Sequence, residues 1–81
     1  MTDDSALTLN MAVAYQLELR RIQIGMTHPE IAEAAHLSTP AVERYLGGTQ
    51  DIPLPAFSAI ASALGVSPLD IFARAQRGMH G

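Results

Sequence analysis

Residues 27–48 constrain the fold more than any other stretch, because they hold two helix starts with room for only a short turn between the helices. Thr27 is followed three residues later by a glutamate, the spacing of a capping box in which each side chain satisfies a backbone N–H of the first turn. Ser38 is a second N-cap candidate, and Gly47 with Gly48 indicates a helix end. Two helices of about two turns each cannot be stable alone. The segment therefore requires flanking helices.

The second helix of this pair, predicted over residues 39–47, has two chemically different sides. At about 100° per residue, apolar side chains fall on one side, and small, polar or charged residues gather on the other. The apolar side holds Ala41, Val42 and Tyr45, the other side holds Thr39, Pro40, Glu43, Arg44 and Gly47, and Leu46 lies at the boundary. This pattern is typical of a helix that enters the DNA major groove, and equally of an amphipathic helix packed on a protein surface.

Three further helices are predicted around this pair. The first spans about residues 7–24, the fourth spans 54–64, and the fifth opens at Ser67 and Pro68 with an acid in its first turn. Residues 1–6 are expected to form a mobile tail, residues 7–77 the folded domain, and residues 78–81 a frayed C-terminal tail. The predicted fold class is all-α, with five helices in one domain.

The first helix carries more apolar residues than a peripheral helix needs. They form two stripes, the first with Leu9, Val13, Leu17 and Ile24, and the second with Met11, Tyr15, Leu19 and Ile22. One stripe suffices to pack a peripheral helix on a core. The second stripe is either further core, which wide apolar coverage favours, or an exposed surface for a protein partner.

Charge argues against a general affinity for nucleic acid. The 81 residues carry a formal net charge of −3, and residues 26–53 hold four acids against Arg44, which again gives −3. Specific binding must therefore rely on backbone amides, helix N-termini, hydroxyls and a few arginines. The chain has no cysteine, an acidic start unlike a secretory signal, and no apolar run of about 20 residues that could span a membrane. We expect a soluble, cytoplasmic protein.

The histidines do not form a catalytic or metal-binding pattern. His28 and His36 are eight positions apart, across two predicted helices, and His80 lies in the expected tail. Helical zinc ligands are four positions apart on one helix. The sequence has no glycine-rich phosphate loop, nucleophile elbow or paired-acid motif. We therefore expect surface or turn histidines, no metal, no cofactor and no enzymatic activity.

The order and spacing of these features resemble the Cro/cI (Xre-type) helix-turn-helix family from Met26 to Phe72. The matching pieces are Met26-Thr27-His28 before Ile31-Ala32, then Leu37-Ser38, Val42 with Gly48, and residues 61–72, which are the most specific part. The resemblance implies a lambda-repressor-like domain of five helices that binds operator DNA. It also implies that His28 lies near phosphate and that Thr39, Pro40, Glu43 and Arg44 face the major groove.

The sequence departs from the family pattern at several positions. His36 occupies a turn position where the family often has glycine, so either it adopts a left-handed conformation or the turn differs. Leu46 stands where a glutamate is frequent, which implies that Arg21 loses its usual partner and is available for another role. Pro40 removes a polar reader, although it can still contact a thymine methyl group. The loop around Asp51 is acidic where relatives tend to be basic.

We therefore expect a sequence-specific DNA-binding transcriptional regulator, a repressor or Cro-like factor of phage or bacterial type. It is expected to bind double-stranded DNA as a symmetric homodimer, with half-sites about 34 Å apart or a multiple of that. The expected base-facing residues are Thr39, Pro40, Glu43 and Arg44, with Arg44 reading guanine, and the expected backbone contacts come from Thr27, His28, Ser38, Gly47, Thr49 and Gln50. For Thr49, ordinary turn chemistry is the favoured interpretation.

The alternative is an acidic protein-interaction module that keeps the fold and does not bind DNA, for example an anti-repressor or an adaptor. Its partner surface would be the second stripe of the first helix, with Met11, Tyr15, Leu19 and Ile22. The acidic charge and the second stripe both favour this alternative.

Overall fold

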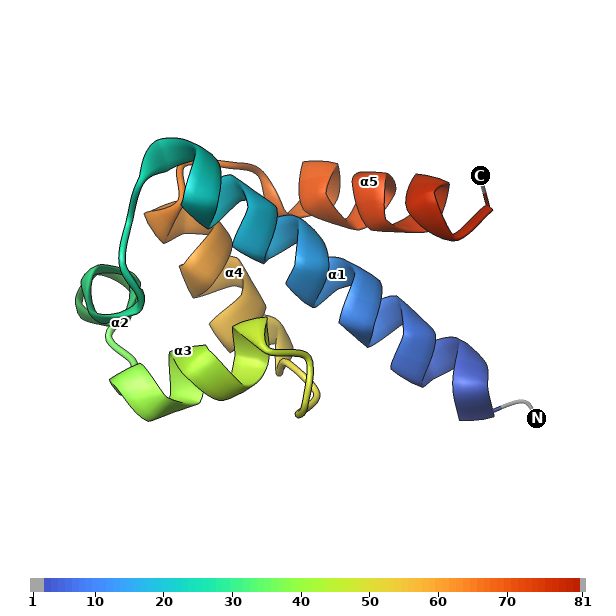
Figure 1. Cartoon of the computed structure of the whole chain (residues 1–81), viewed down its shortest axis with the longest axis horizontal. Helices are drawn as coiled ribbons and strands as arrows, with labels where there is room; N and C mark the ends of the chain where they lie inside the picture. Colours follow the sequence, from blue (N-terminus) through green and yellow to red (C-terminus); the bar gives the residue numbers. More distant parts are fainter. Residues whose placement is uncertain (1–2, 81) are drawn as a thin grey trace.

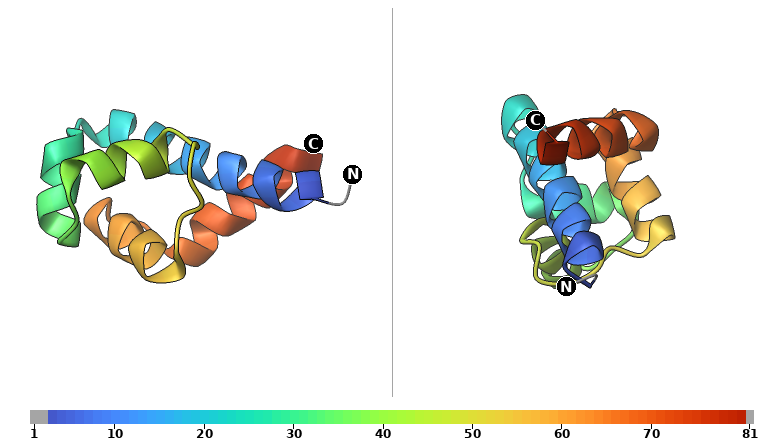
Figure 2. Two further views of the ribbon diagram at one scale, coloured as in Figure 1. Left: turned by 90° about the horizontal axis from the view of Figure 1, so that it is seen from below. Right: turned by 90° about the vertical axis from the view of Figure 1, so that its right-hand side faces the viewer.

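Figure 1 shows the computed structural model, which describes the backbone of residues 3–80 and the side chains of residues 9–78. The elements are α1 (Asp3–Ile24), α2 (His28–Ala35), α3 (Thr39–Leu46), α4 (Leu54–Ala63) and α5 (Pro68–His80). The predicted all-α class with five helices is confirmed, and the described part contains no strand. The helices α2 and α3 lie at one end of the molecule, and α1 and α5 extend from them toward the other end (Figures 1 and 2).

Both outer helices are longer than the sequence pattern indicated. The helix α1 begins at Asp3, before the expected start at residue 7, and α5 continues to His80, beyond the expected end of the domain. Helical backbone thus occupies much of both expected tails, while Met1, Thr2 and Gly81 lie outside the described residues.

One hydrophobic core joins all five helices. Its largest fully buried side chains are Leu17, Ile31, Val42, Ile60, Leu64 and Ile71. The helix α4 buries the apolar side that its spacing predicted, with Phe57, Ile60 and Ala61 all buried. Within residues 3–80, no single helix is long and apolar enough to cross a membrane. Only α4 and α5 together reach that length, as a pair bent by 103°.

The two stripes of α1 differ in burial. Val13 and Leu17 of the first stripe are buried, and Leu9 packs against the core, whereas Ile24 is 39% exposed. In the second stripe, Met11, Tyr15 and Ile22 are more than half exposed, at 53%, 60% and 60%. The interpretation of this stripe as core is therefore wrong, because α1 has neighbouring helices on only part of its circumference.

The helices α1, α2 and α4 end in the same way. In each, a residue with left-handed backbone follows the last turn, and two backbone N–H groups donate back to helical carbonyls, as in a Schellman motif. The left-handed residues are Gly25, His36 and Gly65, and the apolar residues that follow them are Met26, Leu37 and Val66. Each of these apolar residues packs against the core, so each turn fixes the direction of the next segment.

His36 adopts the left-handed conformation, with φ of 59° and ψ of 43°, which is the first of the two alternatives that the sequence left open for this turn. The backbone N–H of Leu37 donates to the Ala32 carbonyl at 2.9 Å, and that of His36 donates to Glu33 at 3.3 Å. A side chain with a Cβ atom is strained in this conformation, where glycine is not.

We predict that His36→Gly raises the free energy of unfolding by about 1 kcal/mol, because it removes this strain from an exposed position. Urea unfolding measures the difference. The matched control is Ala34→Gly on the exposed side of α2, which should lower the free energy of unfolding by about 1 kcal/mol. A loss of stability in His36→Gly equal to that of the control would contradict the left-handed turn.

A polar network joins the end of α1 to the start of α2. The Arg21 Nε atom donates to Glu18 Oε1 at 2.9 Å, and its Nη1 atom donates to the Met26 carbonyl at 2.8 Å. His28 Nε2 lies 3.3 Å from the same Glu18 oxygen. The expectation that Arg21 is available for another role is therefore wrong, because Glu18, three residues earlier on the same helix, replaces the missing glutamate as its partner.

The network makes stability depend on pH. The hydrogen bonds from the Arg21 guanidinium hold the pKa of Glu18 below its ordinary value of 4.5. A carboxyl with a lowered pKa in the folded state stabilises the fold above its ordinary pKa, and this contribution is lost as the pH falls through the lowered value. We predict that Glu18→Gln lowers the free energy of unfolding at neutral pH by up to about 1 kcal/mol. The difference in stability from the parent should narrow as the pH falls below 4.5 and through the lowered pKa of Glu18.

Thermal unfolding of both proteins across this pH range tests the prediction. The exposed acid Glu33 supplies the control, since the free energy of unfolding of Glu33→Gln should differ much less from that of the parent at neutral pH. A gap for Glu18→Gln that stays constant as the pH falls would show that the effect does not come from the ionised carboxylate.

Candidate nucleic-acid interface

The α2–turn–α3 unit forms one end of the molecule (Figure 1). Its first helix begins with the predicted capping box: the Glu30 N–H donates to Thr27 Oγ1 at 3.2 Å, and the Thr27 N–H donates to Glu30 Oε1 at 2.8 Å. The predicted cap of α3 is also present, since Ser38 Oγ accepts from the Ala41 N–H at 3.2 Å. Both helix starts are therefore fixed by local side chains.

The buried side of α3 contains Val42, which is fully buried, and Leu46, which is 5% exposed. Leu46 is thus a core residue, although the helical pattern placed it at the boundary of the polar side. The helix packs against α2 and α1, and Tyr45 packs against the edge of the core. These contacts leave the opposite side of α3 facing outward, toward the viewer in the left view of Figure 2.

The outward side of α3 carries the residues that the sequence assigned to it. Pro40, Glu43, Arg44 and Gly47 are exposed, and Thr39 at the first position is half-buried. The two charges of this surface, on Glu43 and Arg44, cancel. The surface therefore offers hydrogen-bond donors and acceptors rather than a basic patch.

The loop after α3 holds Arg44 from two directions. The Thr49 hydroxyl donates to the Arg44 carbonyl at 3.3 Å, which gives Thr49 the turn role that was favoured for it. The Gln50 side-chain oxygen accepts a hydrogen bond from Arg44 Nε at 2.9 Å. An arginine bound at Nε still has its two terminal nitrogens to donate to a ligand.

The start of α2 combines polar groups with a nearby carboxylate. Thr27 is exposed, and the His28 imidazole is half-buried beside Glu18. The Thr27 and Ser38 oxygens accept the cap hydrogen bonds, which leaves each hydroxyl hydrogen available for donation. Each of these two hydroxyls can therefore donate to an anionic oxygen.

Two of the arginines stabilise the fold instead of extending the interface. Arg21 is held by Glu18 and Met26, and Arg20 Nε donates to the Leu64 carbonyl at the end of α4, at 3.2 Å. Arg74 and Arg77 are exposed on α5, which packs mainly against α1 and α4 rather than against α3. The surface around α3 is therefore neutral to acidic, as the sequence charge indicated.

Metal-binding side chains do not gather in the part of the chain whose side chains are described. No group of three His, Asp or Glu residues there could hold a metal ion. His28 contacts Glu18, and His36 is exposed at the end of α2. The side chain of His80 lies outside the described residues.

Two residues near this surface were not identified from the sequence. Glu18 binds both Arg21 and His28, and its position three residues before Arg21 was a detectable signal. Asn10 binds the backbone of the loop after α3, at Gln50 and Ile52. Nothing in the sequence pairs residues so far apart, so this contact required the structure.

The comparisons with known proteins agree with the helix-turn-helix fold. The sequence profile described as "Helix-turn-helix domain" matches residues 12–71. No curated protein sequence matches the chain significantly.

Two solved structures of the clp gene regulator ClgR from Corynebacterium glutamicum are similar to this chain. One is 27% identical with a TM-score of 0.80, and the match covers 88% of this chain and 92% of that chain. The other is 26% identical with a TM-score of 0.83, covering 89% of this chain and 77% of that chain. Because the profile spans well over half of the sequence, the chain belongs to the helix-turn-helix domain family.

Proposed function

We propose that the chain is a sequence-specific DNA-binding transcriptional regulator that reads the major groove with α3. The observation that carries this proposal is the outward side of α3, which presents Pro40, Glu43 and Arg44 from a helix whose other side is buried. Family membership and the similarity to a gene regulator support it. Within the family, we assign the chain to the Cro/cI (Xre-type) group and to a repressor or Cro-like role in the bacterial or phage-infected cytoplasm.

Each base-facing residue has a chemical role in this proposal. Arg44 donates from its terminal nitrogens to the O6 and N7 atoms of guanine, while Gln50 holds its Nε atom. Glu43 accepts from a cytosine amino group, and Thr39 adds a hydroxyl at the start of the helix. Pro40 contacts a thymine methyl group. These contacts combine donors and acceptors, which suits discrimination between bases more than general affinity.

The backbone contacts are proposed for residues at the two ends of the α2–α3 unit. Thr27 and Ser38 donate from their hydroxyls, and His28 lies at the N-terminus of α2. Gly47, Thr49 and Gln50 lie at the C-terminal end of α3, where the chain leaves the groove. Because Arg20 and Arg21 are engaged within the fold, few phosphates are neutralised. The binding constant should therefore fall only shallowly with salt. For each contacted phosphate, its logarithm should fall by about 0.9 per tenfold increase in salt concentration.

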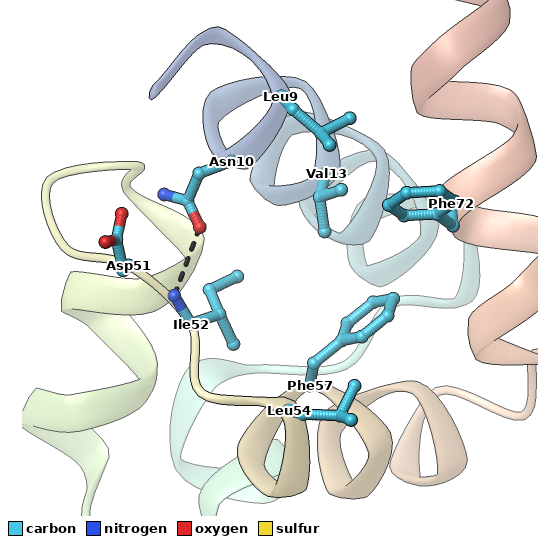
Figure 3. A pocket seen from close by; sticks show the side chains of 8 residues that line it. All are labelled: Leu9, Asn10, Val13, Asp51, Ile52, Leu54, Phe57 and Phe72. Carbon is cyan, nitrogen blue, oxygen red and sulfur yellow. Dashed lines mark hydrogen bonds between the residues drawn. The ribbon is translucent and has the colours of Figure 1, made fainter. Parts of the chain in front are cut away.

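A homodimer is proposed because helix-turn-helix proteins commonly bind paired half-sites as dimers and because apolar side chains are exposed on α4 and α5. Leu54 is 74% exposed, Leu69 is 79% exposed, and Phe72 is 37% exposed. Leu54 and Phe72 also line an apolar pocket of about 400 Å³ between α1, the loop after α3, α4 and α5 (Figure 3). Covering this surface with a second copy would remove it from water.

The second candidate function is a protein-interaction module that does not bind DNA. The exposed second stripe of α1 favours it, with Met11, Tyr15 and Ile22 largely exposed and Leu19 half-buried. The formal charge of −3 over residues 26–53 also favours it. Selection of bound fragments from a random DNA pool separates the two candidates, since the module should enrich no fragment.

We predict that Arg44→Ala weakens binding to the selected site by about 1 to 3 kcal/mol and relaxes preference at one base pair, because a bidentate guanine contact is lost. Titration of the site and of its single-base variants, at one fixed salt concentration, measures both effects. Arg77→Ala on α5 is the matched control and should change neither. Parental affinity in Arg44→Ala would show that this arginine does not read the site.

We predict that the chain is a dimer and that Phe72→Ala raises its dissociation constant about tenfold, because the variant truncates an aromatic side chain that the second copy would bury. Sedimentation velocity over a concentration series measures the constant. Tyr15→Ala removes an exposed aromatic of α1 and serves as the control. Dissociation by Tyr15→Ala alone would instead locate the dimer contact on α1, and a monomeric parent would contradict the dimer.

A further inference from the structure

We propose that Asn10 of α1 is a positioning residue for Arg44, acting through the loop that holds the arginine side chain. This inference rests on the proposed function, because it concerns how accurately Arg44 reads its base. Asn10 lies outside the α2–turn–α3 unit and outside the surface assigned to DNA.

The Asn10 carboxamide binds the loop on both sides of Asp51. Its Nδ2 atom donates to the Gln50 carbonyl at 3.2 Å, and its Oδ1 atom accepts from the Ile52 N–H at 3.1 Å. Figure 3 shows the second of these hydrogen bonds, with Asn10 directed from α1 toward the loop. Ile52 also packs against the core. The backbone around residue 51 is therefore tied to the longest helix by a donor and an acceptor of one side chain.

The same loop makes both contacts to Arg44. The Gln50 side chain accepts from Arg44 Nε at 2.9 Å, and the Thr49 hydroxyl donates to the Arg44 carbonyl at 3.3 Å. A continuous series of hydrogen bonds thus runs from Asn10 to the Gln50 backbone, and from the Gln50 side chain to the guanidinium. The exposed Gln50 side chain can hold Arg44 in one place only if the Gln50 backbone is itself fixed.

Holding Arg44 before DNA arrives has two physical effects. A long arginine side chain loses much rotamer freedom when it is ordered, and preorganisation moves that loss from binding to folding. A guanidinium held at Nε also presents its terminal nitrogens in a defined plane, which a bidentate contact to guanine requires. Loss of Asn10 should therefore reduce discrimination at the base read by Arg44 more than it reduces discrimination elsewhere.

The first experiment needs no DNA. In the uniformly ¹⁵N-labelled protein, the exchange of the Arg44 Nε–H proton with water is measured by NMR. Asn10→Ala and Gln50→Ala should each speed this exchange by about 2- to 10-fold, the range expected for one lost hydrogen bond. Gln50→Glu keeps an oxygen acceptor and should preserve slow exchange. Gln23→Ala, an exposed residue of α1, is the control and should have no effect.

The second experiment measures base discrimination on the selected DNA site. Asn10→Ala should lower discrimination at the Arg44 base pair by about 2- to 10-fold and leave the other positions unchanged. Because Asn10 acts through Gln50, the double variant Asn10→Ala/Gln50→Ala should lose no more than Gln50→Ala alone. If Asn10 only stabilised the fold, Asn10→Ala would instead weaken binding to the site and to all its single-base variants by the same factor. Its effect would also add to that of Gln50→Ala.

If Asn10→Ala leaves the exchange of the Arg44 Nε–H proton unchanged, the positioning role is overturned. It is also overturned if Asn10→Ala weakens DNA binding by the same factor at every base pair and this effect adds to that of Gln50→Ala. If Asn10→Ala does not fold, Asn10→Asp replaces it, because it keeps the acceptor for Ile52 and loses the donor to Gln50. Faster Arg44 exchange in that variant supports the proposal, and unchanged exchange overturns it. A parent that selects no DNA overturns the proposed function instead, whereas the exchange measurement reports on the link between Asn10 and Arg44 in either case.

Discussion

The burial of Val42 and Leu46 determines which side of α3 faces solvent, and the candidate interface depends on it. A helix of eight residues is not stable in isolation, so α3 exists because this side packs on α1 and α2. Rotation of α3 about its axis would expose both apolar side chains and bury the charge of Arg44. The cap at Ser38 and the loop after Gly47 then fix where the helix begins and ends.

Local signals made most of the fold predictable. The capping box at Thr27, the cap at Ser38 and the apolar spacing of α4 depend on residues within about one or two turns of each other, and the structure confirms all three. The extent of the core on α1 could not be predicted in this way. Two apolar stripes look alike in the sequence, and only the placement of the neighbouring helices decides that Tyr15 is exposed while Leu17 is buried.

The exposed residues of the candidate site were predictable from the sequence, but the contacts that hold them in place were not. The exposed side of α3 followed from helical spacing, whereas that spacing placed Leu46 only at the boundary between the two sides and did not predict its burial. The family pattern pairs Arg21 with a glutamate that this sequence lacks, and it does not predict the contact with Glu18, the nearer partner of Arg21. The contact between Asn10 and the loop joins distant parts of the chain, and no local pattern indicates it.

The repeated ending of α1, α2 and α4 has a consequence for changes in chain length. Each turn consists of one left-handed residue followed by an apolar residue that packs against the core, so the number of residues between helices sets the rotation of the next helix. Inserting a single amino acid between His36 and Ser38 would turn α3 by about 100°, directing Arg44 inward and Val42 outward.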